Sequence, residues 1–105
     1  MNSEVSLDVN DKPIALDSFV KGLIDSTIVG ILIVLEGVSE IRRVDLKIDS
    51  DGVIIQVNGE QISLNSFVGN TIRNTICGMI SSFKGVERID TARIKINRRA
   101  PECKI

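Results

Sequence analysis

The feature that most constrains this chain is an internal repeat. Residues 5–49 lie over residues 53–97 without a gap when the sequence is shifted by 48 positions, and 17 of the 45 aligned pairs are identical. The tripeptide Ser-Phe-Val, for example, occurs at both 18–20 and 66–68. Chance does not produce ungapped agreement of this extent, so we interpret the pattern as an internal duplication.

The first part of each repeat is predicted to form a β-hairpin. Apolar and polar residues alternate over 5–9 and over 53–57, and a period of two predicts a strand. Asn58 and Gly59 follow the second run, and this pair favours a tight hairpin turn because both residues tolerate a positive φ. The first repeat has a poorer turn sequence at the same place, and the return strands are expected at residues 14–16 and 62–64.

A helix and a last strand are expected to complete each repeat. In the second repeat an apolar stripe recurs every three or four residues, at Val68, Ile72, Ile76, Met79 or Ile80, and Phe83. Candidate capping residues before the two helices are Asp17 or Ser18, and Asn65 or Ser66. We expect Gly37 and Gly85 to end the helices. Alternation then predicts last strands at 44–48 and 92–96.

Two such β-β-α-β units must share one core, because about 45 residues bury too little surface to be stable alone. We therefore predict an α+β domain over residues 1–105. Its two repeats form one mainly antiparallel six-stranded sheet, with both helices on one face and a pseudo-twofold axis between the halves. Right-handed crossovers favour placing the first strand of each repeat between its other two, with Asp49–Gly52 stepping over one strand. A direct hairpin through that Asp-Gly turn is the alternative, and residues 98–105 are predicted to be a mobile tail.

The composition argues against an enzyme or a metal protein. The chain has no His, which removes the commonest general base and metal ligand. Cys77 lies mid-helix beside apolar Ile76, and Cys103 lies in the tail, where no fixed site can form. No glycine-rich phosphate loop is present, and the segment 49–52 lacks most ligands of a calcium loop. We expect no catalytic residue, no cofactor and no metal.

Targeting signals are also not expected. Residues 1–4 do not begin a secretory signal, two cysteines are too few for a disulfide scaffold, and no stretch approaches the 18 apolar residues of a membrane span. The sequence therefore predicts a cytoplasmic protein without a membrane contact.

A basic cluster raises the possibility of nucleic-acid binding. The last strand and the tail carry five candidate polyanion contacts, at Arg93, Lys95, Arg98, Arg99 and Lys104. Sheets that bind RNA normally stack bases on aromatic side chains, however. The only aromatics, Phe19, Phe67 and Phe83, lie on the helices, where we expect them in the core. With an isoelectric point near 5.4, the chain makes nucleic acid a weaker alternative.

The two predicted helices differ most on the side away from the stripe. Residues 28–35 are apolar all round, and such a helix is buried on more than one side. Small residues recur every fourth position before and within this run, whereas the second helix is polar at most matching positions. The candidate partner interface is therefore Gly22, Ser26, Val29, Gly30 and Ile33. A mid-helix glycine costs about 1 kcal/mol relative to Ala, and we expect Gly30 and Gly78 to mark close packing against the other helix or the sheet.

The apolar face of the first helix is either internal core or a contact with another chain. We favour a second copy in a twofold dimer. Residues 5–49 carry a net charge of −3 and residues 53–97 a net charge of +2, which could steer association or simply reflect drift. The sequence thus predicts a small self-associating or protein-binding module. The alternatives are a small molecule bound between the helices and the sheet, or weak nucleic-acid binding through the basic last strand and tail.

Overall fold

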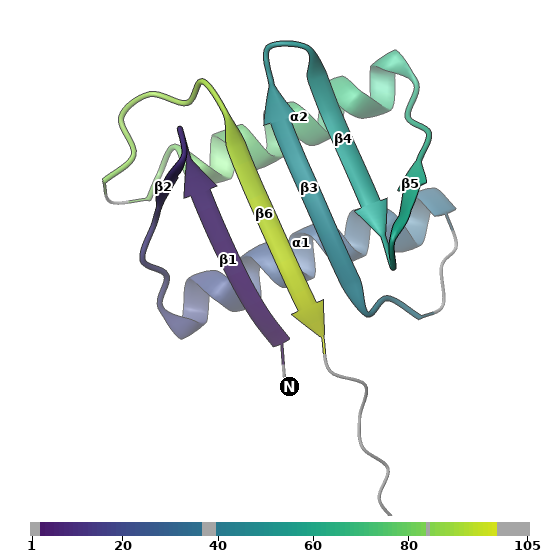
Figure 1. Cartoon of the computed structure of the whole chain (residues 1–105), viewed down its shortest axis with the longest axis horizontal. Coiled ribbons are helices and arrows are strands. Elements are labelled where there is room, and N and C mark those ends of the chain that lie inside the picture. Colours follow the sequence, from purple (N-terminus) through teal and green to yellow (C-terminus); the bar gives the residue numbers. More distant parts are fainter. Residues whose placement is uncertain (1–2, 37–39, 84, 99–105) are drawn as a thin grey trace, which may run out of the picture.

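The computed structural model describes residues 3–36, 40–83 and 85–98. Within these ranges, two helices, α1 (Ser18–Glu36) and α2 (Ser66–Ile80), run in opposite directions behind one six-stranded sheet (Figure 1). All strand pairs are antiparallel, so the predicted α+β class with an antiparallel six-stranded sheet is confirmed. The strands are β1 (Ser3–Val9), β2 (Lys12–Pro13), β3 (Arg43–Asp49), β4 (Gly52–Val57), β5 (Glu60–Ile62) and β6 (Ala92–Arg98).

The order of the strands differs from the expected one. It is β2-β1-β6-β3-β4-β5, so β1 lies between β2 and β6, and β4 lies between β5 and β3. The prediction that the first strand of each repeat sits between its other two is wrong. Only Ser50 and Asp51 separate β3 from β4, and a two-residue turn cannot step over a neighbouring strand. The alternative, a direct hairpin, is correct.

The other two hairpins also close through two-residue turns. Asn10, Asp11, Asn58 and Gly59 all have positive φ, at 53°, 67°, 53° and 89°. The turn predicted at Asn58 and Gly59 is confirmed, and the first hairpin adopts the same shape although Asp11 replaces the glycine. Because such a turn reverses the chain at once, β2 and β5 begin two residues before the predicted return strands at 14–16 and 62–64. The prediction of a strand at 14–16 is wrong, since β2 ends at Pro13, and the predicted strand at 62–64 overlaps β5 only at Ile62.

The turn asparagines bind the segments that lead into the two central strands. The side-chain Nδ2 of Asn10 donates to the carbonyl of Arg88, and its Oδ1 accepts from the backbone N–H groups of Asp90 and Thr91, at 2.7–2.9 Å. Asn58 makes three bonds of the same kind to the segment before β3, with Glu40, Arg42 and Arg43. Each turn therefore anchors the chain just before the strand that pairs with its own hairpin.

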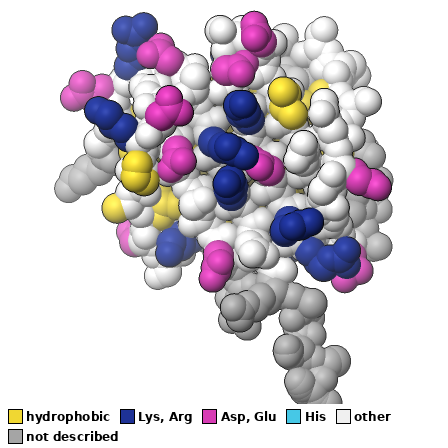
Figure 2. Space-filling model, in the orientation of Figure 1, with side chains coloured by type: hydrophobic (Ala, Val, Ile, Leu, Met, Phe, Trp, Pro, Cys, Tyr) yellow, Lys and Arg dark blue, Asp and Glu magenta, His cyan; other side chains and the backbone are white. Residues whose placement is uncertain are grey.

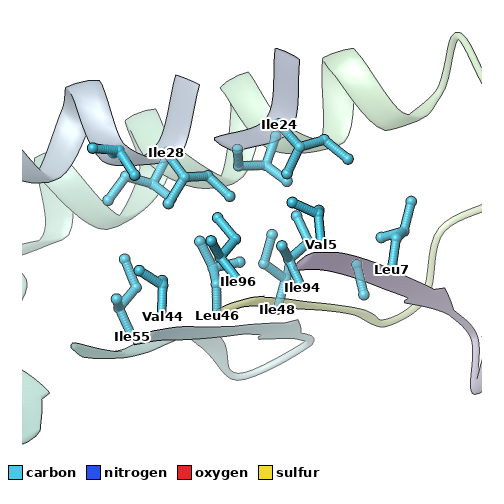
Figure 3. Close-up of a cluster of buried hydrophobic side chains, with 14 of the residues drawn as sticks. Val5, Leu7, Ile24, Ile28, Val44, Leu46, Ile48, Ile55, Ile94 and Ile96 are labelled. Atoms are coloured by element: carbon cyan, nitrogen blue, oxygen red, sulfur yellow. The ribbon is translucent and has the colours of Figure 1, made fainter. Parts of the chain in front are cut away.

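The core fills the space between the helices and one face of the sheet (Figure 3). The predicted stripe of α2 is confirmed for Ile72, Ile76 and Ile80, which are buried, whereas Phe83 lies beyond the end of the helix. On the sheet, the inward positions of the central strands are buried, among them Leu46 of β3 and Ile94 of β6. The helix residues at the centre of the core are Ile24, Ile28 and Leu32 of α1 and Ile72, Ile76 and Ile80 of α2.

Both helices begin where the sequence predicts. The carboxylate of Asp17 and the side-chain oxygen of Asn65 each accept a hydrogen bond from the N–H group three residues later, as N-caps do. The end of α2 was predicted wrongly. The helix stops at Ile80, and Gly85, with a φ of 87°, lies five residues further on. Gly37 lies outside the described residues.

Candidate functional site

The side of α1 that points away from the sheet is apolar and uncovered. We call it the α1 face, and it consists of Phe19, Gly22, Leu23, Ser26, Gly30, Ile33 and Val34. All seven residues are exposed, with Phe19 75%, Ile33 50% and Val34 88% accessible, and none is charged. A continuous apolar surface of this kind on a small protein is typical of a contact site.

Small residues form the middle of the α1 face. A Cβ atom added at Gly22 or at Gly30 would meet nothing within 4 Å. The expectation that Gly30 and Gly78 mark close packing against the sheet or the other helix is therefore wrong, since Gly78 is equally open. The low surface at Gly22, Ser26 and Gly30 instead leaves room for another backbone to approach closely.

Val29 does not belong to this surface. It is only 7% exposed and packs in the core, whereas the other four candidate interface residues lie on the α1 face. The reason is geometric. Val29 lies four residues after Asp25 and three before Leu32, both buried, and so belongs to the same flank of the helix.

Two phenylalanines expected in the core are exposed instead. Phe19 and Phe67, at matching positions of the two repeats, are 75% and 76% accessible. Each is the second residue of its helix and precedes the first buried isoleucine, Ile24 or Ile72, by five residues. Five residues correspond to a rotation of about 140° around the helix, which turns the ring away from the sheet.

A groove of about 430 Å³ adjoins the α1 face. It runs between the second half of α1 and the first half of α2, and it is almost entirely apolar. Phe67 and Val34 stand at its exposed border. Its lining residues are Thr27, Gly30, Ile31, Val34, Leu35, Phe67, Val68 and Thr71. The sequence did not predict this groove, since it depends on how the two helices lie side by side.

The matching surface of α2 is polar. Asn70, Thr71, Asn74 and Thr75 are exposed there, at the places where α1 has Gly22, Leu23, Ser26 and Thr27. Apart from Phe67, the solvent side of α2 thus offers amides and hydroxyls to water. This difference between the helices is the strongest asymmetry of the helical layer.

The length of α1 also corrects one expectation. The segment Ser18–Leu35 is long and apolar enough, by length and composition alone, to cross a membrane. The sequence prediction overlooked it because glycine, serine, threonine and two charged residues interrupt the apolar run. Only 28% of this segment is buried inside the protein.

The solvent face of the sheet carries the predicted basic residues of β6. Figure 2 shows Lys and Arg side chains gathered near the middle of this face, with an acidic side chain among them. The guanidinium of Arg93 forms two hydrogen bonds to the carboxylate of Asp45, at 3.1 and 2.9 Å. These bonds hold the pKa of Asp45 below its usual value and raise the pKa of Arg93. Arg93 is therefore already engaged with an anion of its own chain.

Arg98 has a different role from the one predicted. It is the last residue of β6 rather than the start of a tail, and its Nε lies 3.5 Å from the carboxylate Oδ1 of Asp25. Asp25 is 2% exposed, the one buried charged residue in the described part of the chain. Lys95 is exposed on the sheet face. The two remaining polyanion candidates, Arg99 and Lys104, lie outside the described residues, as does Cys103.

The space between the helices and the sheet leaves little room for a ligand. Where Ile28, Leu32, Leu46, Ile55 and Ile72 converge, the gap is too small for a water molecule. Within residues 3–36, 40–83 and 85–98, no group of three or more Cys, Asp or Glu side chains is placed to hold a metal ion.

Comparison of the chain with protein-family models, with curated proteins and with solved structures found no match.

Proposed function

We propose that this protein is a small, non-enzymatic self-associating module whose copies dimerise through the α1 face. The observation that carries the proposal is the pairing of two unlike helices on one sheet. Both bury the same side, yet the outer side of α1 is apolar and uncharged while that of α2 is polar. A purely solvent-facing helix would carry polar residues there, as α2 does.

Burial of the α1 face supplies the driving force. Phe19, Ile33 and Val34 are half to almost fully exposed, and covering one large apolar side chain contributes about 1.5–3 kcal/mol. The cost of association, at least about 4 kcal/mol, must be offset by this gain. Because the face holds no charge, no ion has to lose its hydration when it is covered.

A second copy accounts for this surface better than a bilayer does. To cross a membrane, α1 would have to leave the sheet, which would expose the buried apolar face of the sheet, including Val5 and Leu7 of β1, to water. It would also separate buried Asp25 from Arg98. Dimerisation covers the α1 face and disturbs none of these contacts.

Nucleic-acid binding has weaker support. Of the three described polyanion candidates, Arg93 is bonded to Asp45 and Arg98 is paired with Asp25. The exposed aromatic rings of Phe19 and Phe67 belong to the helices, on the opposite side from the basic sheet face. Rings and cations thus do not share a surface, as a base-stacking platform requires.

We also propose that the fold arose by duplication and has a pseudo-twofold axis between β3 and β6. The ungapped repeat supports this idea. So does the strand order, in which each hairpin pairs with the last strand of the other repeat. The matched bonds of Asn10 and Asn58 join residues that are all 48 positions apart, 88 with 40, 90 with 42 and 91 with 43.

The test compares one charge placed on each helix. Ser26 and Asn74 occupy matching, exposed positions on α1 and α2. We expect Ser26→Glu to weaken dimerisation by about tenfold or more, because it buries two facing carboxylates. Asn74→Glu should weaken dimerisation less than Ser26→Glu does, because the polar outer side of α2 lies further from the centre of the contact.

Sedimentation velocity over a range of concentrations measures both dissociation constants, and circular dichroism confirms that each variant is folded. A wild-type protein that stays monomeric at high micromolar concentration would contradict the proposal. So would a Ser26→Glu variant that dimerises as tightly as Asn74→Glu. Wild-type binding to neutral lipid vesicles, without dimerisation, would favour a membrane as the occupant instead.

A further inference from the structure

Five of the seven residues of the α1 face are spaced symmetrically about Ser26. Ser26 stands at its middle, Gly22 and Gly30 lie four residues to either side, and Phe19 and Ile33 lie seven residues to either side. The series is therefore bulky, small, small, small, bulky. In an α-helix these spacings place all five residues on one side.

This symmetry fits an antiparallel pair of identical helices. About a twofold axis at Ser26, a residue of one copy faces the residue whose number is 52 minus its own in the other copy. Phe19 then faces Ile33, Gly22 faces Gly30, and Ser26 faces itself. A twofold contact joins the same patch of both copies, so here the bulky ends meet each other and the low centres face each other. A parallel pair would instead set Phe19 against Phe19.

The same twofold rotation about Ser26 places part of the second copy over the groove beside α1. When two helical layers stack face to face with α1 antiparallel to α1, the first half of one helix lies over the second half of the other. The groove begins beside that second half, at Gly30 and Val34. The exposed apolar residues of the first half that face it are Phe19 and Leu23. Phe19 and Leu23 of each copy thus lie over the groove of the other copy, so the dimer contains this contact twice.

The area needed for a stable dimer makes the groove part of the contact. With 19 residues, α1 is about 28 Å long and about 10 Å wide, which gives a footprint of about 300 Å². Specific dimers bury about 800 Å² per partner. The contact must therefore extend from α1 across the groove to α2, where Phe67 presents a further apolar surface.

We propose that two copies stack their helical layers face to face with the α1 helices antiparallel about Ser26, and that Phe19 of each copy packs against Ile33 and the α1–α2 groove of the other. This geometry rests on the proposed self-association and specifies how it occurs. It makes Phe19 and Ile33 a pair that exists only between copies.

Opposite charges introduced at Phe19 and Ile33 test this geometry. Phe19→Lys and Ile33→Glu are made singly and together, at sites 75% and 50% exposed, so the monomer has room for each side chain. Each single variant should weaken dimerisation by about tenfold or more. The double variant should recover to within about threefold of the wild-type dissociation constant, because the introduced lysine of each copy then faces the introduced glutamate of the other. Its dimer should also weaken at high salt, unlike the wild-type dimer.

Sedimentation velocity and circular dichroism provide the readouts. If the singles weaken a wild-type dimer and the double weakens it further, like charges face each other and the antiparallel arrangement is wrong, although self-association stands. If the wild type dimerises and no substitution changes its dissociation constant, the antiparallel arrangement is wrong and the α1 face is not the interface. If the wild type does not dimerise at all, the proposed function itself fails.

Discussion

The two helices contact the sheet through matching residues, but they expose different kinds of side chains to solvent. Toward the sheet, α1 buries Ile24 and Ile28 where α2 buries Ile72 and Ile76, at positions 48 residues apart. Toward solvent, α1 presents phenylalanine, glycine and aliphatic residues, and α2 presents mainly asparagine and threonine. The inner surface is fixed by the shape of a shared core, whereas the outer surface is free to take on a function.

One position at the edge of the core shows how far the two helices diverge. Asp25 of α1 is buried and paired with Arg98 at the end of β6. The matching residue of α2 is Arg73, whose Nη1 donates to the backbone carbonyl of Asp49, the last residue of β3, at 2.8 Å. Each helix is thus held to the end of a central strand by a charged side chain, but the two charges are opposite.

The largest predicted effect tests the shared inner surface. Ile28→Ala and Ile76→Ala each remove a fully buried side chain at matching positions and should lower the free energy of unfolding by about 2–5 kcal/mol. We expect the two losses to agree within about 1 kcal/mol, because the two sites bury the same side chain in one core. Urea denaturation measures both, in a Ser26→Glu background so that dissociation does not contribute.

A loss at Ile28 several times that at Ile76 would show that the helices do not support the core equally. The comparison of their outer surfaces would then have to allow for a difference in their inner ones.

An intermediate effect is predicted at the turns that anchor the central strands. Asn10→Gly and Asn58→Gly keep a residue that tolerates positive φ and remove three side-chain hydrogen bonds each. Because five of these six bonds are exposed to solvent and the one from Thr91 to Asn10 is half-buried, we expect each variant to lose about 1–2 kcal/mol of stability in urea denaturation. Hydrogen exchange should report faster opening near residues 88–91 in the first variant and 40–43 in the second. Opening confined to the hairpin that carries the substitution would contradict the anchoring role.

The smallest effect concerns Asp45 and Arg93 on the sheet face. Folding lowers the pKa of Asp45 because Arg93 donates hydrogen bonds to its carboxylate, so the pair stabilises the fold above the unfolded pKa. That stabilisation is lost as the pH falls through the folded pKa. Since both side chains are partly exposed, Asp45→Asn should cost no more than about 1 kcal/mol at neutral pH.

The same variant should match the wild type at a low pH, below the lowered pKa of Asp45, where the carboxylate becomes protonated. Denaturation at both pH values measures the change, with Glu4→Gln on neighbouring β1 as the control. If Asp45→Asn lowers the free energy of unfolding by the same amount at neutral and at low pH, the ion pair with Arg93 is not the cause of that loss.

Local chemistry made part of the fold predictable. The caps at Asp17 and Asn65, the turn at Asn58 and Gly59, and the buried stripe of α2 all depend on residues close together in the sequence. The antiparallel sheet and the α+β class follow from the same patterns. The order of the strands does not follow from crossover handedness, because the two-residue turn at Ser50 and Asp51 pairs β3 directly with β4.

The candidate site was less predictable, because it depends on how elements pack. Four of the five candidate interface residues are exposed, but Val29 is buried, because it shares the flank of α1 that carries Asp25 and Leu32. Phe19 and Phe67 were assigned to the core from their hydrophobicity, although counting from Ile24 and Ile72 would have placed them outside. The groove arises only when α1 and α2 are set side by side.

The central claim is that the α1 face holds two copies together, and the molar mass in solution tests it most directly. Light scattering behind size exclusion, at low and high salt, should give twice the chain mass of 11.5 kDa in both conditions. An apolar contact is insensitive to screening, so the mass should not fall as salt rises. A mass of one chain at high protein concentration, or a dimer that dissociates at high salt, would contradict the account.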